Sequence, residues 1–525
     1  MYFADSVLAV GRRRWLQRAL PSLMVVAALG AWLLPISLGR LIDGDEGYLL
    51  MAARLIGEGH WPYRDFFLTQ APLLPAVLGA VFRIFGRSWL TARVFSGALA
   101  VVMGWLVYRE SLSATRRQSA ALFATAVFAL NGASIGWLTI VKGYGLSAVL
   151  LLAFVVLVGF VVRRATDPQA DRHAKIAILS AGLALGLAAS TRLYTVLVMP
   201  ALAVYLVAKL GLDRVNLRRL GLLAVGCMFG LLPLIVSFVR DPKSFLFDTL
   251  LFHAVREYGQ DSLLGTAGDK LPVILKSFGL DSFATYGERQ WMGLAIVAIV
   301  ARLVRLRLPN APASVAPVVA LMLIAASVLP NPYSPQYLCL VVPFLAVEAG
   351  RLMGSLLDGF GSKPQSWTMA VVVAAIAYLT YNGWVGWHDR QRFLYSGIAV
   401  PGIEYTDHVP RWRIGTVEAV AKAVDAQHIA VAASWWPGYF VSSKTSIVLT
   451  LANDFGLRAA SVLSTEERRR LHIVSHSEVG DMIKRRQPRL FVEGNWASYP
   501  TTTLLPQHGY QLRATVQNAN VWTID

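Results

Sequence analysis

The sequence predicts a polytopic α-helical membrane protein of about eleven transmembrane helices, with juxtamembrane helices and a C-terminal extracytoplasmic α/β domain. Of the 525 residues, 55% are hydrophobic and only 15% are charged, whereas soluble domains contain about 25% charged residues. The hydrophobic residues form long runs, and short basic clusters separate many of these runs. The net charge of +18 therefore indicates orientation in a membrane, and no nucleic-acid partner is expected.

Eleven apolar runs approach the roughly 17–25 residues that a membrane helix requires. A twelfth run, 72–86, is shorter and contains Pro72, Pro75 and Arg83, so we expect it to lie along the membrane surface. The first run is too long for the apolar part of a cleaved signal peptide, and we interpret it as a retained helix. The predicted spans are 20–39, 91–108, 119–137, 144–162, 175–190, 193–209, 219–239, 291–304, 313–330, 336–352 and 367–387.

The basic residues set the predicted orientation, because cytoplasmic loops of membrane proteins are enriched in Lys and Arg. With 72–86 on the surface, alternate loops collect most of the positive charge. The loops on the other side contain few basic residues beyond Lys142 and Arg192. Counting 72–86 as a span would place the arginines of 109–117 outside. We therefore expect a cytoplasmic N-terminus and an extracytoplasmic C-terminus.

Two domains are predicted. Residues 1–390 form the transmembrane domain, with outer loops at 40–90 and 240–290, and residues 391–525 form a soluble extracytoplasmic α/β domain. In the second part charge rises, the spans stop, and short strands alternate with helices, at a length normal for one domain. The predicted strands are 428–433, 446–451 and 489–494, and the predicted helices are 415–424 and 478–486.

Four acids gather just after the first span, in a chain where charge is otherwise scarce: Asp43, Asp45, Glu46 and Asp65. Asp45 and Glu46 begin a predicted helix that ends near Gly57. Its apolar residues recur at helical spacing, so we expect the helix to lie on the membrane with its polar face toward an aqueous cavity.

Two interpretations of these acids stay open. Acidic residues at a helix N-terminus interact favourably with the helix dipole, which accounts for Glu46 but accounts poorly for Asp43, because Asp43 precedes the turn at Gly44. Alternatively, one carboxylate is a general base that takes a proton from an acceptor hydroxyl while its oxygen attacks the anomeric carbon of a sugar.

The stretch "DGDEGYLLMAARLIGEGHWPYRDFFLTQAPLLPAVLGAVFRIFGRSWLTAR" resembles the first outer loop of the GT-C glycosyltransferases, which use polyprenyl-phosphate sugars. It is most similar to the branch with the protein O-mannosyltransferases and the lipid A aminoarabinose transferase. The shared features are an acidic pair, a G-x-x-P-Y-x-D segment, a Pro-Leu helix ending in Phe-Gly, and an Arg opening the next span. Residues 190–206 and 335–346 resemble later parts of the same family.

The resemblance implies the GT-C fold in a bacterial inner membrane and sugar transfer with inversion on the extracytoplasmic face. Asp45 or Asp43 becomes the candidate base, with a preference for Asp45, and Glu46 helps orient the acceptor. The family branch with a lipid A acceptor has Lys-Pro where this chain has Gln70-Ala71-Pro72. Some members also carry a second acid where this chain has Lys142-Gly143-Tyr144. Both departures argue against a direct equivalent of the aminoarabinose enzyme.

A polyprenyl-phosphate leaving group requires positive charge to stabilise it. Cations are rare on the outer face, so we expect some of them to bind the donor phosphate, although a snorkelling Arg192, a solvated Arg256 or a membrane-belt Tyr337 are alternatives. The predicted donor phosphate-binding residues are Arg192, Tyr337, Lys142, Arg256 and Tyr194. The predicted acceptor- or sugar-binding residues are Tyr63, Arg64, Asp65, Gln70 and His253.

No cofactor is expected, since the energy for transfer lies in the phosphate ester of the donor and no Gly-rich phosphate loop occurs. A divalent cation is not required by this chemistry. The sequence names neither the sugar nor the acceptor, which can be a glycolipid, a cell-wall polysaccharide or a protein. The alternatives are a lipid or glycan flippase or transporter, which predicts charges near the centres of several spans, a non-catalytic scaffold, and an O-antigen polymerase or ligase.

Overall fold

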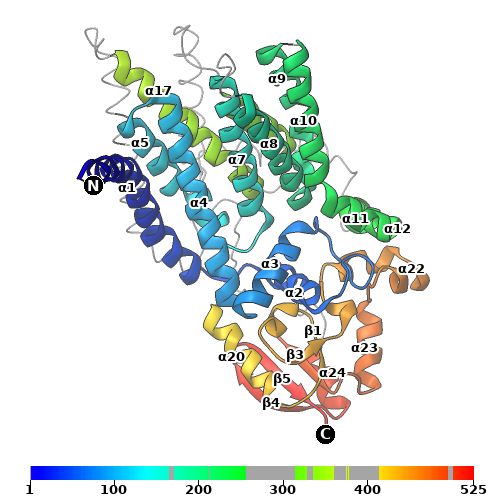
Figure 1. The fold of residues 1–525 in the computed structure, drawn as a ribbon. Coiled ribbons are helices and arrows are strands. Elements are labelled where there is room, and N and C mark those ends of the chain that lie inside the picture. The colour runs from blue at the N-terminus through cyan, green and yellow to red at the C-terminus, as the bar shows by residue number, and fades with distance from the viewer. Residues whose placement is uncertain are drawn as a thin grey trace.

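The computed structural model describes residues 2–164, 171–211, 213–255, 314–327, 335–359, 413–494 and 501–525, together with 374 and 377. A helical bundle stands above a smaller C-terminal domain, with α2 and α3 between them (Figure 1). The first part contains α1 (Tyr2–Gly39), α2 (Gly44–Glu58), α3 (Leu73–Phe85), α4 (Trp89–Thr115), α5 (Gln118–Ala129), α6 (Gly132–Trp137), α7 (Gly143–Arg163), α8 (Asp171–Thr191), η2 (Leu193–Leu197), α9 (Val198–Leu210), α10 (Arg214–Gly230), α11 (Leu232–Arg240), α12 (Pro242–Leu246), η3 (Phe247–Leu251), α13 (Phe252–Val255), α16 (Ala316–Ser327), η4 (Pro335–Val341) and α17 (Val342–Gly359).

Five helices among the described residues are long and apolar enough to cross a membrane, or six if the pair α10 and α11, bent by 48°, forms one span. They include the predicted spans that begin at residues 20, 91, 144, 175 and 336. The run 119–137 is divided between α5 and α6, which are separated by Leu130 and Asn131. Two predicted spans, 291–304 and 367–387, lie outside the described residues. The total of about eleven spans stays a prediction.

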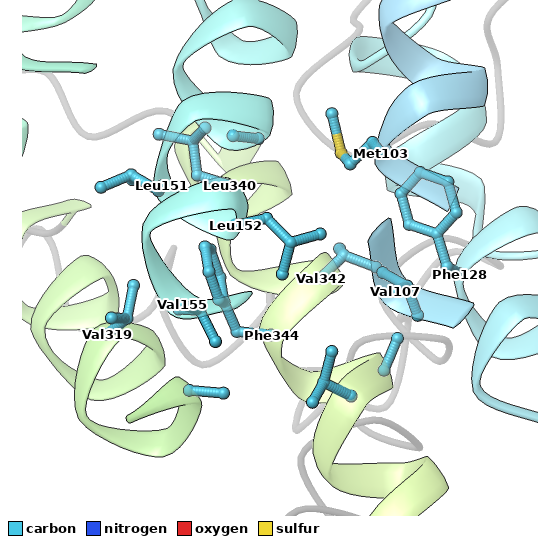
Figure 2. Packing of buried hydrophobic residues seen from close by; sticks show 14 of the residues in the cluster. Met103, Val107, Phe128, Leu151, Leu152, Val155, Val319, Leu340, Val342 and Phe344 are labelled. Carbon is cyan, nitrogen blue, oxygen red and sulfur yellow. The ribbon is translucent and has the colours of Figure 1, made fainter. Parts of the chain in front are cut away.

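The spans pack around a continuous apolar core. Figure 2 shows side chains from α4, α5, α7, α16, η4 and α17 converging in it. The labelled residues are Met103, Val107, Phe128, Leu151, Leu152, Val155, Val319, Leu340, Val342 and Phe344, all buried. This core holds the ends of α4 and α7 in fixed positions, and both helices begin at the face toward the C-terminal domain (Figure 1).

Helices α8 and α10 approach each other so closely that only glycine fits at their contact. A Cβ atom at Gly182 would lie 2.1 Å from the carbonyl oxygen of Leu223, and one at Gly226 would lie 2.1 Å from that of Leu179. Small residues spaced by one helical turn allow such backbone contact between membrane helices. Ser190 also donates a hydrogen bond to the carbonyl of Gly230 (2.8 Å). The C-terminal end of α8, which leads into Arg192, is thereby fixed in place.

The C-terminal domain is built on a five-stranded mixed sheet of order β2-β1-β3-β5-β4, in which β2, β1 and β3 are parallel and β5 and β4 are antiparallel. The predicted strands and both predicted helices occur there, although 446–451 is only partly a strand. The last two strands form a hairpin that was not predicted. The elements are α20 (Ile414–Asp425), β1 (Val431–Ser434), η5 (Pro437–Phe440), β2 (Ser446–Ile447), η6 (Leu449–Leu451), α21 (Gly456–Ala459), η7 (Ala460–Val462), α22 (Thr465–Arg470), α23 (His476–Lys484), β3 (Leu490–Glu493), α24 (Thr501–Gln507), β4 (Gln511–Val516) and β5 (Ala519–Thr523).

The C-terminal domain and the first outer loop share one hydrophobic core. Trp436 donates a hydrogen bond to the carbonyl of Gly44 (2.9 Å), and Trp89 donates one to Gly438 (3.1 Å). The buried Arg54 of α2 donates to the carbonyl of Thr445 (2.9 Å). The expectation that α2 lies on the membrane is therefore wrong, because protein covers all residues from Glu46 to Leu55. The predicted domain boundary near 390 lies outside the described residues.

Candidate functional site

Helix α2 begins with a reciprocal cap formed by two of its acids. The side chain of Asp43 accepts a hydrogen bond from the backbone N–H of Asp45 (3.0 Å), and Glu46 accepts one from the backbone N–H of Asp43 (2.8 Å). This capping box satisfies backbone donors that the first turn leaves unpaired. The sequence argument that capping accounts poorly for Asp43 is wrong, since Asp43 is itself the N-cap residue.

Glu46 is enclosed in a saturated hydrogen-bond network. Its carboxylate pairs with Arg93 through two bonds, from Nε (2.7 Å) and Nη2 (2.6 Å), and also accepts a bond from the backbone N–H of Val141 (2.9 Å). Arg93 in turn donates to the carbonyls of Ser37 and Leu41 at the end of α1. With both side chains fully buried, this pair connects α1, α2, α4 and the segment before α7. Such contacts fit a positioning role for Glu46.

Asp43 and Asp45 meet a single cation, Lys142. Its ammonium lies 2.8 Å from Oδ1 of Asp43 and 2.9 Å from Oδ2 of Asp45. Burial alone raises the pKa of Asp43, but the adjacent Lys142 ammonium outweighs it and holds that pKa below its usual value. Burial likewise opposes the charge of Lys142, yet the two carboxylates raise its pKa. Asp43 and Lys142 are therefore both charged at neutral pH.

Asp45 is the more accessible of the two aspartates. Its side chain is 30% exposed, against 16% for Asp43. Oδ2 of Asp45 binds Lys142, and within the described part of the chain no hydrogen bond occupies Oδ1. Asp43 is tied to both Lys142 and the helix backbone. Asp45 thus retains an oxygen that can accept a proton from a ligand.

Arg192 lies in a cluster of three tyrosines that we call the tyrosine cage. Its guanidinium carbon lies 3.9 Å from the ring centre of Tyr144, 5.2 Å from Tyr194 and 5.9 Å from Tyr337. Such cation–π contacts hold the charge without neutralising it. No carboxylate among the described residues pairs with Arg192, in contrast to Lys142. The tyrosine cage therefore contains a cation that is available to an anion.

The acid cluster and the tyrosine cage adjoin. Gly143, the residue after Lys142, lies against Arg192, so a Cβ there would lie 3.1 Å from Cγ of the arginine. Charges of both clusters act on the hydroxyl of Tyr48 in α2. Burial raises the pKa of this hydroxyl, the charge of Asp45 adds to the increase, and the charges of Lys142 and Arg192 oppose it. Acids, ammonium and guanidinium thus belong to one site.

The predicted acceptor-binding residues fall into two groups. Gln70 belongs to the site, because its amide donates a hydrogen bond to the Tyr48 hydroxyl (2.7 Å), and buried Tyr63 donates to the carbonyl of Gln70 (2.7 Å). Asp65 instead accepts from the backbone of Trp61 (2.7 Å) in the turn after α2. Arg64 in that turn is mostly exposed.

Two further predicted residues lie near the second outer loop. His253 of α13 contacts the carbonyl oxygen of Thr69 through Nε2 (3.2 Å), which connects this loop to the first one. Arg256 lies outside the described residues. No group of three or more His, Cys, Asp or Glu side chains that could hold a metal occurs in the described ranges.

Four residues of the site were not predicted as such. Arg93 and Tyr48 stand inside the stretch that carries the family resemblance, and Tyr144 directly follows Lys142 and Gly143, so their signal was their position in those segments. Asp454 has no such signal, because a loop of the C-terminal domain supplies it. Burial raises the pKa of Asp454 to about 7, and the negative charge of Asp45 contributes to the increase. The next residue, Phe455, packs edge-on against Tyr48 of α2, with ring centres 5.1 Å apart.

Comparisons with known proteins identify the fold. The chain is similar to ArnT from Cupriavidus metallidurans bound to undecaprenyl phosphate, with a TM-score of 0.58 and 14% identity over 97% of this chain and 98% of that one. It is also similar to the Archaeoglobus fulgidus oligosaccharyltransferase in complex with Zn and sulfate, with a TM-score of 0.52 and 13% identity over 95% and 73%. A scan of family models and a search of curated proteins found no match.

The fold is that of the GT-C membrane glycosyltransferases, as the resemblance predicted. A third structure, of AglB from Archaeoglobus fulgidus in complex with an inhibitory peptide and a dolichol-phosphate, has a TM-score of 0.50 and 11% identity over 97% of this chain and 75% of that one. Both the fold and the apolar helices are those of a multi-pass membrane protein.

Proposed function

We propose that the protein transfers a sugar from a polyprenyl-phosphate donor to a hydroxyl acceptor on the extracytoplasmic face of a bacterial inner membrane. The observation that carries this proposal is the pairing, within one site, of a carboxylate oxygen that accepts no hydrogen bond from the described residues and a cation that has no acidic partner among them. Asp45 supplies the first and Arg192 the second. The solved structures with similar folds, which contain undecaprenyl phosphate or a dolichol-phosphate, support the choice of donor.

The reaction is a single displacement with inversion. The acceptor oxygen forms a bond to the anomeric carbon as the bond from that carbon to the phosphate oxygen breaks, and the phosphate leaves with the electron pair. The acceptor proton passes to Oδ1 of Asp45. Lys142 holds the other oxygen of Asp45 and directs the carboxylate. General-base catalysis of this kind contributes about 10²–10⁴-fold to a rate.

Arg192 binds the departing phosphate. A guanidinium makes strong hydrogen bonds to phosphate oxygens, and the tyrosine cage keeps it in place without occupying it with an acid. Lys142 has two carboxylates within 2.9 Å, so we assign it to the acids and not to the phosphate. Because the phosphate ester of the donor already carries the energy for transfer, the reaction needs no nucleotide. We assign stabilisation of the leaving phosphate to Arg192, so this mechanism does not call for a metal.

A deletion strain combined with purified protein tests the proposal. Extraction of lipid-linked sugars from the deletion strain should reveal an accumulated polyprenyl-phosphate sugar by mass spectrometry. The purified protein, incubated with that lipid and membranes of the deletion strain, should release polyprenyl phosphate and label the acceptor. The Asp45→Asn variant should fail in this assay, whereas Asp481→Asn, which changes an exposed carboxylate of the C-terminal domain, should not. Unchanged lipids in the deletion strain would contradict the proposal.

A further inference from the structure

A loop of the C-terminal domain packs against α2 near the acid cluster of Asp43, Asp45 and Lys142. Residues 449–455, which we call the acceptor loop, comprise η6 and the segment that leads from it to α21. The ring of Phe455 packs edge-on against Tyr48, with centres 5.1 Å apart. A Cβ at the next residue, Gly456, would lie 3.4 Å from the ring of Phe67. The C-terminal domain therefore supplies part of the wall of the site, and the acids of that site belong to the N-terminal part of α2.

This loop holds three buried polar atoms that have no hydrogen-bond partner among the described residues: Oγ1 of Thr450, Nδ2 of Asn453 and Oδ1 of Asp454. Asn453 is only 4% exposed. Its other amide atom accepts a hydrogen bond from the backbone of Phe455 (3.1 Å), which fixes the orientation of the side chain. Native proteins leave few buried polar atoms unpaired, and each one requires an explanation. Here a donor, an acceptor and a hydroxyl occur together.

The contact between Phe455 and Tyr48 places this loop beside the N-terminal part of α2, where its charges act on those of the acid cluster. The charged and titratable groups that act on Asp454 are Asp45 of α2, which raises its pKa, and Arg458 of α21, which lowers it, after the larger effect of burial. Asp454 also acts on the hydroxyl of Tyr48, as Asp45, Lys142 and Arg192 do. Tyr48 thus lies between the acid cluster and the acceptor loop.

We propose that Asn453 and Asp454 bind hydroxyl groups of the acceptor, so that the C-terminal domain forms the acceptor subsite. The proposal rests on the function proposed above. An amide donor beside a carboxylate acceptor matches neighbouring hydroxyls of a sugar, each of which can both donate and accept. A lipid-linked donor places its phosphate at Arg192, at the end of the membrane helices. The acceptor loop contacts Tyr48, three residues after Asp45, through the ring of Phe455, and in this proposal the attacking hydroxyl enters beside that contact.

The preferred acceptor is therefore the sugar part of a glycolipid or polysaccharide. The unpaired atoms of Asn453 and Asp454 are one hydrogen-bond donor and one acceptor, which matches a ligand that exchanges hydrogen bonds in both directions, as a polyol does. A site that hydrogen-bonds a hydroxyl discriminates strongly against ligands that lack it, because its buried polar groups are then left unpaired. Asn453 and Asp454 are, in this proposal, specificity-determining residues and not the general base.

The test uses full-length protein in lipid nanodiscs and separates acceptor binding from donor binding. Transfer is measured while membranes of the deletion strain, which carry the unmodified acceptor, are titrated at fixed donor, and then with the two roles exchanged. Asn453→Ala and Asp454→Ala should each raise the half-saturating amount of acceptor membranes at least about tenfold. The half-saturating donor concentration and the binding of undecaprenyl phosphate should stay within twofold of the unmutated protein. Asp481→Ala is the matched control.

A second measurement keeps the subsite testable if no transfer is found. Saturation-transfer NMR with methyl glucoside, methyl galactoside and methyl mannoside reports sugar binding directly, without turnover. At least one of these probes should bind the unmutated protein, and Asp454→Ala should abolish its signal. Equal sugar binding by both proteins, or variants that shift only the donor dependence, would overturn the acceptor subsite. Loss of transfer in the unmutated protein with intact sugar binding would instead overturn the function proposed above.

Discussion

Two acid–cation clusters begin within the first turn of α2, and they differ in how far their bonds are satisfied. Glu46 and Arg93 are completely buried, and the carboxylate accepts four hydrogen bonds. Asp45 is 30% exposed, shares Lys142 with Asp43, and keeps one oxygen without a hydrogen bond from the described residues. Adjacent residues of similar chemistry thus have different uses: the saturated cluster holds four segments together, and the unsaturated one can act on a ligand.

The largest effect is expected from breaking the saturated cluster. Glu46→Ala leaves the guanidinium of Arg93 buried without its carboxylate, and removing one partner of a buried ion pair costs about 3–5 kcal/mol. We expect a large fall in the thermal unfolding temperature and poor recovery from membranes. Asp358→Ala, which breaks an exposed ion pair with Arg117, should lose about 1 kcal/mol or less. Equal stability of the two variants would show that Glu46 is not a structural residue.

The opposite result is expected for the unsaturated cluster. Asp45→Asn keeps the size of the side chain and its place beside Lys142, but amide oxygen is a far weaker base than carboxylate. We expect transfer to fall by about 10²–10⁴-fold, while the unfolding temperature stays close to that of the unmutated protein. The measurement is release of polyprenyl phosphate from donor by purified protein. Full activity of Asp45→Asn would remove Asp45 from the mechanism and leave Asp43 as the candidate.

The sequence predicted this contrast only in part. The acids, the few cations predicted for the outer face and the family resemblance singled out Asp43, Asp45, Lys142 and Arg192. The structure brings these four residues together, and their roles stay predictions. What the sequence could not show was the pairing of Glu46 with Arg93, 47 positions away, since a carboxylate in a helix cap and one in a buried ion pair look alike in a sequence. Burial decides between them, and burial is a property of the assembled helices.

The C-terminal domain shows a second limit. Its α/β class followed from short alternating elements, yet the terminal hairpin of β4 and β5 was missed. Gln511–Val516 does alternate polar and apolar residues, but the strand is short and its side chains are largely exposed. The packing of this domain on α2 was also not predicted. An apolar helix stripe near a membrane fits lipid and protein equally well. The contribution of Asp454 to the site depends on that packing and has no local sequence signal.

The same contrast separates two arginines of the site. Arg93 has a carboxylate, whereas the partners of Arg192 among the described residues are tyrosine rings. We expect Arg192→Met to weaken binding of undecaprenyl phosphate by about 10–100-fold, because hydrogen bonds to charged groups contribute about 1.5–3 kcal/mol. Native mass spectrometry of the purified protein can measure this binding, and Arg192→Lys should lie between. Arg240→Met, which removes an arginine stacked on Trp61, is the matched control. Equal binding by the Arg192→Met variant would place the phosphate elsewhere.

The smallest effect concerns Asp454, which lacks the hydrogen bonds that Glu46 possesses. Its pKa is about 7 in the folded protein, against a usual value of 3.8. Between pH 3.8 and pH 7 the folded state binds a proton at Asp454 more tightly than the unfolded state does, so this residue lowers the stability of the folded protein as the pH rises toward 7. Above pH 7 the stability stays at that lower level. Asp454→Asn removes this dependence, and we expect it to raise the unfolding temperature at pH 8 by about 1–3 °C.

That gain should shrink as pH falls toward 5, where Asp454 of the unmutated protein is protonated and resembles the amide. Thermal unfolding followed by tryptophan fluorescence from pH 5 to pH 8 measures it, with Asp481→Asn as the exposed control. A gain that is constant across this range would mean that Asp454 is ionised throughout and has a partner. If Asp454→Asn stabilises the protein at pH 8 and also weakens its use of the acceptor, the carboxylate is retained for ligand binding at a cost in stability. Functional residues are often less favourable for stability than a substitute would be.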